Sequence, residues 1–164
     1  MITGRARLAG SHVRADEILD DAHLTEFMLQ GGEYSQLVPW LFAGRRPDLG
    51  ATLQKGDILV AGENFGAGSS GEIVPLTLKA AGISCIVASS FARTFYRTGI
   101  NLGILPIECT VRAREMDVLE IYPEEGKLVV NHTGRYTFRT FPPMVLALIR
   151  EKGLLNYYRS HGTL

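Results

Sequence analysis

Neither sign of charge is in excess in this sequence. Lys and Arg total 17, and Asp and Glu also total 17, in 164 residues. A protein that binds the phosphate backbone of nucleic acid through counterion release needs a basic excess. We therefore expect no nucleic-acid partner.

Long apolar runs are also missing. No stretch approaches the roughly 18 apolar residues that a membrane-spanning helix needs, and the N-terminal segment MITGRARLAGSHVRADE contains Arg and Asp before any apolar run of signal-peptide length. The sequence thus predicts no membrane association and a cytoplasmic protein.

Cysteine is scarce, with Cys85 and Cys109 as the two in the chain. Each lies in an apolar, strand-like segment (ISCIVAS and LPIECTV), which is more typical of buried free thiols than of a disulfide. Two isolated cysteines are fewer than the three or four thiolates of an iron–sulfur cluster or a structural zinc site. We expect no metal bound by this chain, so any such metal must come from another chain.

The common phosphate-binding fingerprints are absent or incomplete. A P-loop needs a lysine near its glycines, and none lies near the glycines of ENFGAGSSGE (63–72). Gly66, Gly68 and Gly71 meet the G-x-G-x-x-G spacing, but the next apolar strand ends in Ala88, Ser89 and Ser90 instead of the acidic residue that a dinucleotide site uses. A nucleotide-binding protein is therefore disfavoured.

Apolar strand-like runs alternate with helical patterns, which predicts an α/β or α+β fold in one domain spanning residues 1–164. DILVAG (57–62) and ISCIVASS (83–90) are nearly all apolar and indicate strands buried on both faces. They flank a helix expected at 71–81. The other expected strands are ARLAG (6–10), ILPIEC (104–109), VLEIYP (118–123), KLVVNH (127–132) and YTFRTF (136–141), the last three antiparallel.

The remaining segments are less regular. Residues 11–24 indicate loop and short helical turns, TEFMLQGG (25–32) or SQLVPWLFAG (35–44) indicates a helix, and Asp48 to Lys55 indicates a turn. FARTFYRTGINLG (91–103) predicts an amphipathic helix with Arg93 and Arg97 on one face, available for the site, a partner or ion pairs within the fold. PMVLALIREKG (143–153) predicts a final helix before a polar tail at 154–164.

Gly66, Gly68, Ser69 and Ser70 lie where a buried strand leads into a helix. Backbone amides at such a place point outward without partners and can bind an anion, and glycines allow close approach of a ligand. A serine hydroxyl among such donors could act as a base if its alkoxide were stabilised. The simpler interpretation is that Ser69 or Ser70 only caps the helix, with Glu72 in its first turn.

The order of two segments is more specific than either motif alone. GDILVAGENFGAGSSGE (56–72) followed by AAGISCIVASSFARTFYRTGINLGILPIEC (80–109) strongly resembles the small subunits of isopropylmalate isomerase (3-isopropylmalate dehydratase) and homoaconitase, equivalent to the swivelling domain of aconitase. HVRADEIL (12–19) resembles a degenerate form of that family's D-x-D-T-D-x-I-x-P segment, and GLLNYYRSHG (153–162) extends the similarity. The resemblance implies an α/β fold, namely a swivelling β/β/α domain with a mixed sheet flanked by helices.

The resemblance also implies a mechanism. A separate large subunit would carry a 4Fe-4S cluster that acts as a Lewis acid on a 2-hydroxy acid, and this chain would close over it as half of a hydro-lyase in leucine or related amino-acid biosynthesis. Ser69 would be the catalytic base that takes the proton α to a carboxylate. Ser70, Gly68, Gly71 and the helix amides would bind a substrate carboxylate.

Two departures from the family pattern concern this carboxylate. The family's arginine after the two serines is Gly71 here, and DEILDDAHL (16–24) places Ala22 at a second arginine position and His23 at a tyrosine position of the family segment D-E-I-I-P-A-R-Y-L. Each lost charge-assisted hydrogen bond to a carboxylate costs about 1.5–3 kcal/mol. Either the substrate is less charged at that end, or another cation replaces the arginines, or the chain binds its partner without efficient catalysis.

The cations available as replacements are His12, Arg14, His23, Arg45 and Arg46. Of these we select Arg14 and His23 as substrate-binding residues, and we expect an altered substituted malate as substrate. Asp16 keeps the family's acidic position and is expected to fix the loop by hydrogen bonds. A non-catalytic or regulatory anion-binding protein, which could associate with itself when isolated, is the alternative function.

Overall fold

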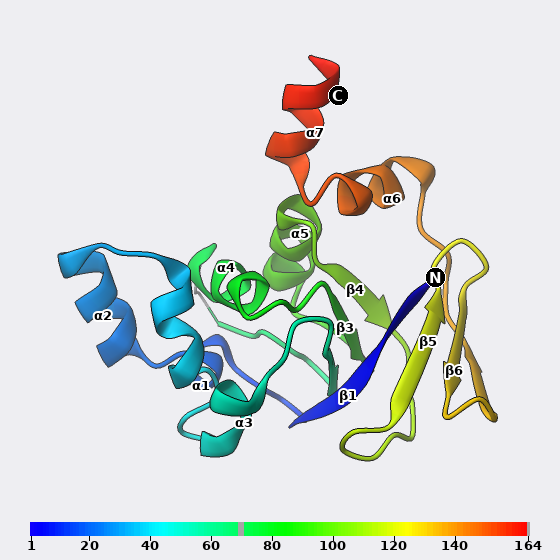
Figure 1. Ribbon diagram of the computed structural model, residues 1–164, viewed down its shortest axis with the longest axis horizontal. Coiled ribbons are helices and arrows are strands. Elements are labelled where there is room, and N and C mark those ends of the chain that lie inside the picture. The colour runs from blue at the N-terminus through cyan, green and yellow to red at the C-terminus, as the bar shows by residue number, and fades with distance from the viewer. Residues whose placement is uncertain (69–70, 164) are drawn as a thin grey trace.

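The computed structural model describes residues 1–68 and 71–163 (Figure 1). Within these residues the chain forms a seven-stranded mixed sheet in the order β4-β3-β2-β1-β5-β6-β7. The strands are β1 (Ile2–Gly10), β2 (Ile58–Ala61), β3 (Cys85–Ala88), β4 (Leu105–Glu108), β5 (Val118–Tyr122), β6 (Lys127–Val130) and β7 (Gly134–Thr137). The helices are α1 (Ala15–Ile18), α2 (Asp21–Gln30), the 3-10 helix η1 (Tyr34–Trp40), α3 (Pro47–Thr52), α4 (Ile73–Ala80), α5 (Arg93–Leu102), α6 (Pro143–Arg150) and α7 (Leu154–His161).

Strand β1 changes its pairing partner along its length. Residues 2–5 pair antiparallel with β5, and residues 6–10 pair parallel with β2, with a register shift between Leu8 and Gly10. The parallel strands β1 to β4 therefore end at one edge of the sheet, and the antiparallel strands β5 to β7 extend it on the other side of β1. We call the end of β1 to β4 the carboxyl edge. Functional loops of parallel sheets gather at such an edge.

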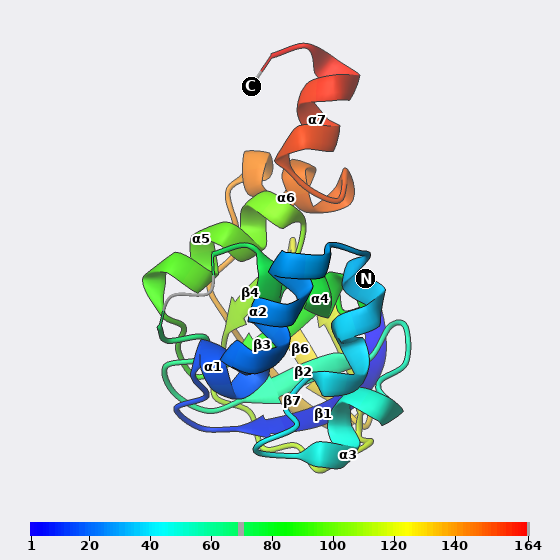
Figure 2. The same cartoon turned by 90° about the vertical axis from the view of Figure 1, so that its left-hand side faces the viewer.

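The side chains of the parallel strands alternate between two apolar cores. Leu59 and Ile86 pack with the helices that follow β1 and β2, whereas Val60 and Val87 pack with β5 and β6. Figure 2 shows α1, α2 and α4 in front of the sheet on the first of these faces. The expectation that β2 and β3 are buried on both faces is confirmed.

Several expected elements have different limits in the structure. β1 begins at Ile2 because its first residues pair with β5. The expected turn at 48–55 contains α3, whose first residue Pro47 has its φ preset for a helix. Both alternatives for the early helix form, as α2 and η1.

Within the expected polar tail, residues 154–161 form a helix that the sequence did not predict, α7. This helix has no buried residue and projects from the body of the molecule (Figures 1 and 2). Its contacts are with α5 and α6. Without a buried stripe, the apolar periodicity that marks a helix in a sequence is weak.

Both cysteines are free thiols, as expected. Cys85 is fully buried, but Cys109 is only partly buried because it follows the end of β4. Burial raises the pKa of both thiols. No helix in residues 1–68 or 71–163 is long and apolar enough to cross a membrane.

A buried ion-pair network connects β1 to the loops around it. Arg7 is 4% exposed, and its guanidinium donates to Asp57 at 2.8 Å and to Glu115 at 2.7 Å. Glu115 also accepts hydrogen bonds from the Leu8 N–H at 2.8 Å and from Arg46 at 2.9 Å. Burial would raise the pKa of Glu115, but these hydrogen bonds together lower it. The network is therefore charged and fully paired.

Removing one partner from this network should destabilise the fold strongly. We expect Asp57→Ala to lower the free energy of unfolding by about 1–3 kcal/mol, since Arg7 stays buried with one acceptor fewer while Glu115 still pairs with it. Urea denaturation of the purified chain measures the change. Glu124→Ala is the matched control, because it removes a carboxylate from the solvent-exposed pair with Arg150 and should have little effect. Equal losses in the two variants would contradict the prediction.

Candidate active site

The glycine loop after β2 lies at the carboxyl edge, between the loops that follow β1 and β3. The Gly66 N–H donates to the Val13 carbonyl at 2.8 Å, and the Phe65 N–H donates to the Ser90 carbonyl at 3.0 Å. Ala67 accepts from the Ala15 N–H at 2.7 Å. The backbone of residues 65–67 is thus fixed on both sides before the chain reaches the two serines.

Two serines that the sequence did not single out for this role anchor the start of the loop. The Ser11 hydroxyl accepts a hydrogen bond from the Glu63 N–H at 3.0 Å, and the Ser90 hydroxyl accepts one from the Asn64 N–H at 2.8 Å. Both serines follow strands of the parallel sheet. In the sequence, the signal for this role was a serine that follows a buried strand. Only the pairing of β1, β2 and β3 shows that Ser11 and Ser90 both hold the glycine loop.

Gly66 allows the loop to pack directly on α5. Its φ is +80°, and a β-carbon at this position would lie 2.4 Å from the Phe95 ring. Phe95 packs edge-on against Phe65, and Phe65 packs edge-on against Phe91. This aromatic cluster supports the loop from below, and only glycine fits above it.

The catalytic serine and one substrate-binding residue of the sequence prediction, Ser69 and Ser70, lie outside the described residues. Their neighbours Gly68 and Gly71 have φ values of +97° and +55°. α4 begins at Ile73, two residues later than expected, with Glu72 preceding it in a helical conformation. The loop therefore leads into the first turn of α4, as the sequence predicts.

Arg14 lies beside this loop. Arg14 and Ala67 form an isolated parallel β-bridge, and a β-carbon at Gly68 would lie 3.8 Å from Nη2 of Arg14. The Arg14 Nε donates to Asp16 at 2.9 Å, so this carboxylate orients the guanidinium. No other acceptor for the Arg14 side chain occurs in the described part of the chain. Arg14 can thus offer its terminal nitrogens to a ligand at the loop.

His23 occupies a different part of the same face, between α2 and η1. Its backbone N–H donates to Asp20 at 2.9 Å and its Nδ1 lies 2.8 Å from the same carboxylate, which lowers the pKa of Asp20. Its ring stacks on Trp40 with centroids 4.1 Å apart. Both residues line a pocket of about 300 Å³ to which the glycine loop contributes no residue. The contacts of His23 therefore lie within the α2–η1 unit.

The other candidate cations differ in how fully they are engaged. His12 lies 3.6 Å from the carboxylate of Glu63, at the start of the loop. Arg45 donates to Glu17 at 3.0 Å and to the Ser11 carbonyl at 2.7 Å. Arg46 belongs to the Glu115 network and also pairs with Asp48. Arg46 is therefore a structural residue, while His12 and Arg45 border the loop.

Arg93 and Arg97 are both exposed on α5. Neither has an ion-pair or hydrogen-bond partner among the residues that the structure describes, so ion pairing within the fold does not account for them there. Within residues 1–68 and 71–163, no group of three or more His, Cys, Asp or Glu side chains is placed to hold a metal ion. The described residues thus include two exposed arginines without ion-pair partners on α5, and no ligand set for a metal.

A mixed sheet flanked by helices, with a glycine loop and Arg14 at its carboxyl edge, defines an α/β protein, and comparison with known proteins identifies its family. The family model described as the aconitase C-terminal domain matches residues 46–112. The chain is 39% identical to the 3-isopropylmalate dehydratase small subunit 1 of Thermotoga maritima, over 99% of this chain and 98% of that protein. It is 37% identical to the methanogen homoaconitase small subunit of Methanothermobacter thermautotrophicus, over 96% and 91% of the two chains.

Two further relatives come from Methanocaldococcus jannaschii. The isopropylmalate/citramalate isomerase small subunit is 37% identical over 97% of this chain and 94% of that protein. The crystal structure of a 3-isopropylmalate dehydratase superposes with a TM-score of 0.87 at 31% identity, covering 98% of this chain and 95% of that one. The structural similarity thus spans nearly the whole of both chains.

The chain belongs to the family of small subunits of 3-isopropylmalate dehydratase and homoaconitase, within the aconitase group. It is a small subunit of a hydro-lyase, and the fold and family expected from the sequence are confirmed. The roles of the individual site residues remain predictions.

The fit between Gly66 and Phe95 provides a test of the loop. We expect Gly66→Ala to lower the free energy of unfolding by about 1–2 kcal/mol for its left-handed backbone and by a further 1–3 kcal/mol, roughly, for overpacking against the ring. Gly71→Ala is the matched control, because its φ is also positive but no atom of residues 1–68 or 71–163 lies within 4 Å of the added β-carbon. This variant should lose only the stability that is due to the left-handed backbone. Equal losses in urea denaturation would show that the contact with Phe95 is not tight.

Proposed function

We propose that residues 1–164 act as one swivelling domain that closes over a cluster-bearing large subunit and presents the loop at 66–72 to a 2-hydroxy carboxylic acid. The observation that carries this proposal is the position of Arg14 beside Gly68, with terminal nitrogens that have no acceptor among the described residues, at a loop whose backbone is fixed by both neighbouring loops. A fixed set of donors needs little reorganisation when an anion binds. The relatives named as small subunits support the two-chain assembly.

The 4Fe-4S cluster would belong to the large subunit, because the described residues of this chain offer no ligand set for it. When bound there, such a cluster supplies Lewis-acid activation of the substrate hydroxyl. This chain's contribution is the proton transfer. The deprotonated Ser69 hydroxyl takes the proton from the carbon α to a carboxylate and keeps it, and the hydroxyl on the adjacent carbon leaves as hydroxide, which gives the unsaturated acid.

Re-addition of water in the opposite orientation returns that proton from Ser69 and completes the isomerisation. During both steps Ser70, Gly68, Gly71 and the first amides of α4 hold a carboxylate. Arg14 supplies the positive charge that the family's arginines would supply at the positions of Gly71 and Ala22. This assignment uses the guanidinium nearest to the loop and needs no movement of the Glu115 network.

The substrate that fits this site best is a substituted malate with fewer charges than a tricarboxylic acid. One guanidinium beside the loop replaces the two of the family pattern, and each missing charge-assisted hydrogen bond costs about 1.5–3 kcal/mol. A relative in Methanocaldococcus jannaschii is named for isopropylmalate and citramalate, and citramalate is a methylated malate. We propose that His23 and the pocket beside Trp40 contact the uncharged substituent.

The alternative of a non-catalytic anion-binding protein has no observation in its favour. The relatives that span the chain are named as enzyme small subunits.

Replacing the proposed base tests the mechanism. We expect Ser69→Ala to lower turnover of the complex reconstituted with the large subunit by about 10²–10⁴-fold, the usual contribution of a general base. The affinity of the two subunits, measured by calorimetry, should not change. Ser160→Ala on α7 is the control for loss of an exposed serine hydroxyl. Unchanged turnover of Ser69→Ala would remove Ser69 from the mechanism.

Restoring a family arginine tests the substrate class. Gly71→Arg should raise the ratio of kcat/KM for a citrate-type tricarboxylic acid over that for a methylated malate by about 10- to 100-fold, since one charge-assisted hydrogen bond is regained. Among the described residues, no atom lies within 4 Å of a β-carbon at this position. Gly71→Met imposes the same backbone strain without the charge. If both variants show the same ratio, the missing charge does not set specificity.

A further inference from the structure

A second cleft opens on α5, outside the loop described above. It has a volume of about 580 Å³ and lies between α5 and the segment that leads from β7 into α6. Its lining combines apolar and aromatic side chains with polar and charged ones. Among the lining residues are Tyr96, Ile100, Phe141 and Val145, together with Glu108 and Arg139.

The cleft and the glycine loop lie along the same edge of the sheet. Glu108 is the last residue of β4, and the next N–H, of Cys109, donates to the carbonyl of Ala88 at the end of β3. The hydroxyls of Thr110 and Ser89 are 3.1 Å apart. A partner protein that covers the loop after β2 and extends over the ends of β3 and β4 would therefore also contact the cleft.

Unpaired positive charge surrounds this cleft. Arg93, Tyr96, Arg97 and Ile100 follow the i, i+3, i+4, i+7 spacing of one helix face, so the two arginines lie beside the lining residues. Both are exposed and lack a carboxylate partner in the described part of the chain, and the same holds for Arg139. Elsewhere several arginines pair with a carboxylate at 2.5–3.0 Å, namely Arg7, Arg14, Arg45, Arg46 and Arg150.

The pKa of Tyr96 depends on two charged side chains of the cleft. Burial raises its pKa, the negative charge of Glu108 raises it further, and the positive charge of Arg139 opposes the rise. Glu108 and Arg139 therefore both act on the phenol from within the cleft. With the carboxylate of Glu108 in its lining, the cleft is poorly suited to a free small anion, while Arg93 and Arg97 beside it suit carboxylates held on a larger body.

We propose that the face formed by Arg93, Arg97 and the cleft beside Tyr96 binds an acidic segment of the large subunit, with carboxylates on the arginines and an apolar side chain in the cleft. The inference rests on the proposed function, because it assigns a docking surface to the same partner. A stable interface buries roughly 800 Å² on each chain, more than a substrate loop alone supplies. Complementary charge at its rim increases the association rate.

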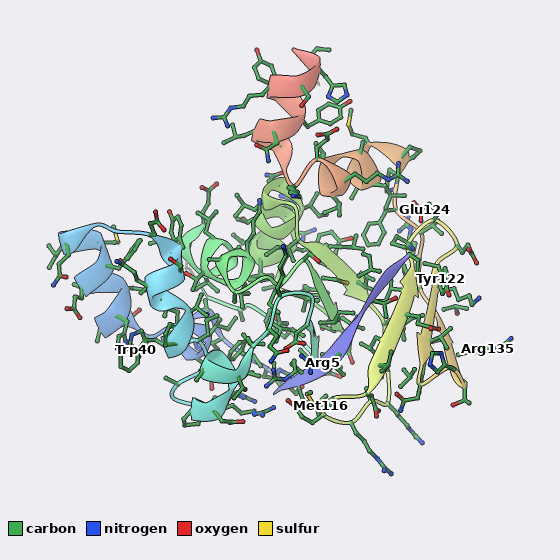
Figure 3. All side chains as sticks on the ribbon, in the orientation of Figure 1. Arg5, Trp40, Met116, Tyr122, Glu124 and Arg135 are labelled. Atoms are coloured by element: carbon green, nitrogen blue, oxygen red, sulfur yellow. The ribbon has the colours of Figure 1, made fainter. Side chains whose placement is uncertain are left out.

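Charge reversal tests the docking surface. The chain carrying Arg93→Glu and Arg97→Glu should associate with the large subunit about 10- to 100-fold more slowly at low salt, with a weaker dependence on ionic strength. The control carries Arg135→Glu and Arg159→Glu, which make the same change in net charge at two exposed arginines without ion-pair partners in the described chain. Arg135 lies on β7 at the far edge of the sheet (Figure 3). Association of this control should match that of the unmodified chain.

Filling the cleft provides a second test that changes no charge. Val145→Trp should raise the dissociation rate of the complex, because the larger side chain occupies the space proposed for the apolar anchor. Urea denaturation of each variant checks that the fold is kept. Equal binding of the Arg93/Arg97 variant and the unmodified chain would overturn the inference, as would equal weakening of the two charge-reversal variants.

Two other outcomes separate this inference from the proposed function. If the Arg93/Arg97 variant binds the large subunit normally but has a raised KM, these arginines contact the substrate and the docking assignment is overturned alone. If the unmodified chain fails to bind the large subunit, the proposed two-chain function fails and the docking surface fails with it.

Discussion

The pairing of β1 with two different partners is the constraint on which the rest of the structure depends. Because the second half of β1 runs parallel to β2, the loops after β1, β2 and β3 meet at one edge and exchange backbone hydrogen bonds. The first half of β1 runs antiparallel to β5. Side chains of β5 and β6 therefore pack against the opposite face of the parallel strands. The buried Arg7 pairs with Asp57 and Glu115 near the point where the pairing changes.

The fixed loop has a chemical consequence. A serine base needs donors that are already in place when its charge develops, since moving them during the reaction would cost free energy. The structure fixes the backbone up to Ala67 through Val13, Ser90 and Ala15, and it places Phe95 beneath Gly66. The position of Arg14 beside Gly68 follows from the same pairing, because Arg14 and Ala67 form a β-bridge.

The arginines divide into two groups with different physical roles. Those close to β1, such as Arg7 and Arg46, are held by carboxylates and stabilise the fold. Arg93 and Arg97 on α5 are exposed and have no such partner in the described chain, so their charge is available to a second molecule. This division explains how a chain with no net charge can still present a locally basic face at its carboxyl edge.

The sequence by itself determined the α/β class, the buried strands β2 and β3, the helices α4 and α5, the family and the position of the glycine loop, because each depends on local apolar pattern or on a short ordered motif. It did not identify α7, which has no buried stripe, nor the roles of Ser11 and Ser90, whose partners are about 52 and 26 residues away along the chain. Only the tertiary structure decided that Arg46 is structural, that Arg14 lies beside Gly68 and that Arg93 and Arg97 are unpaired within the described residues. A side chain's availability for chemistry depends on contacts between segments distant in sequence, and the pairing of β1 brings those segments together.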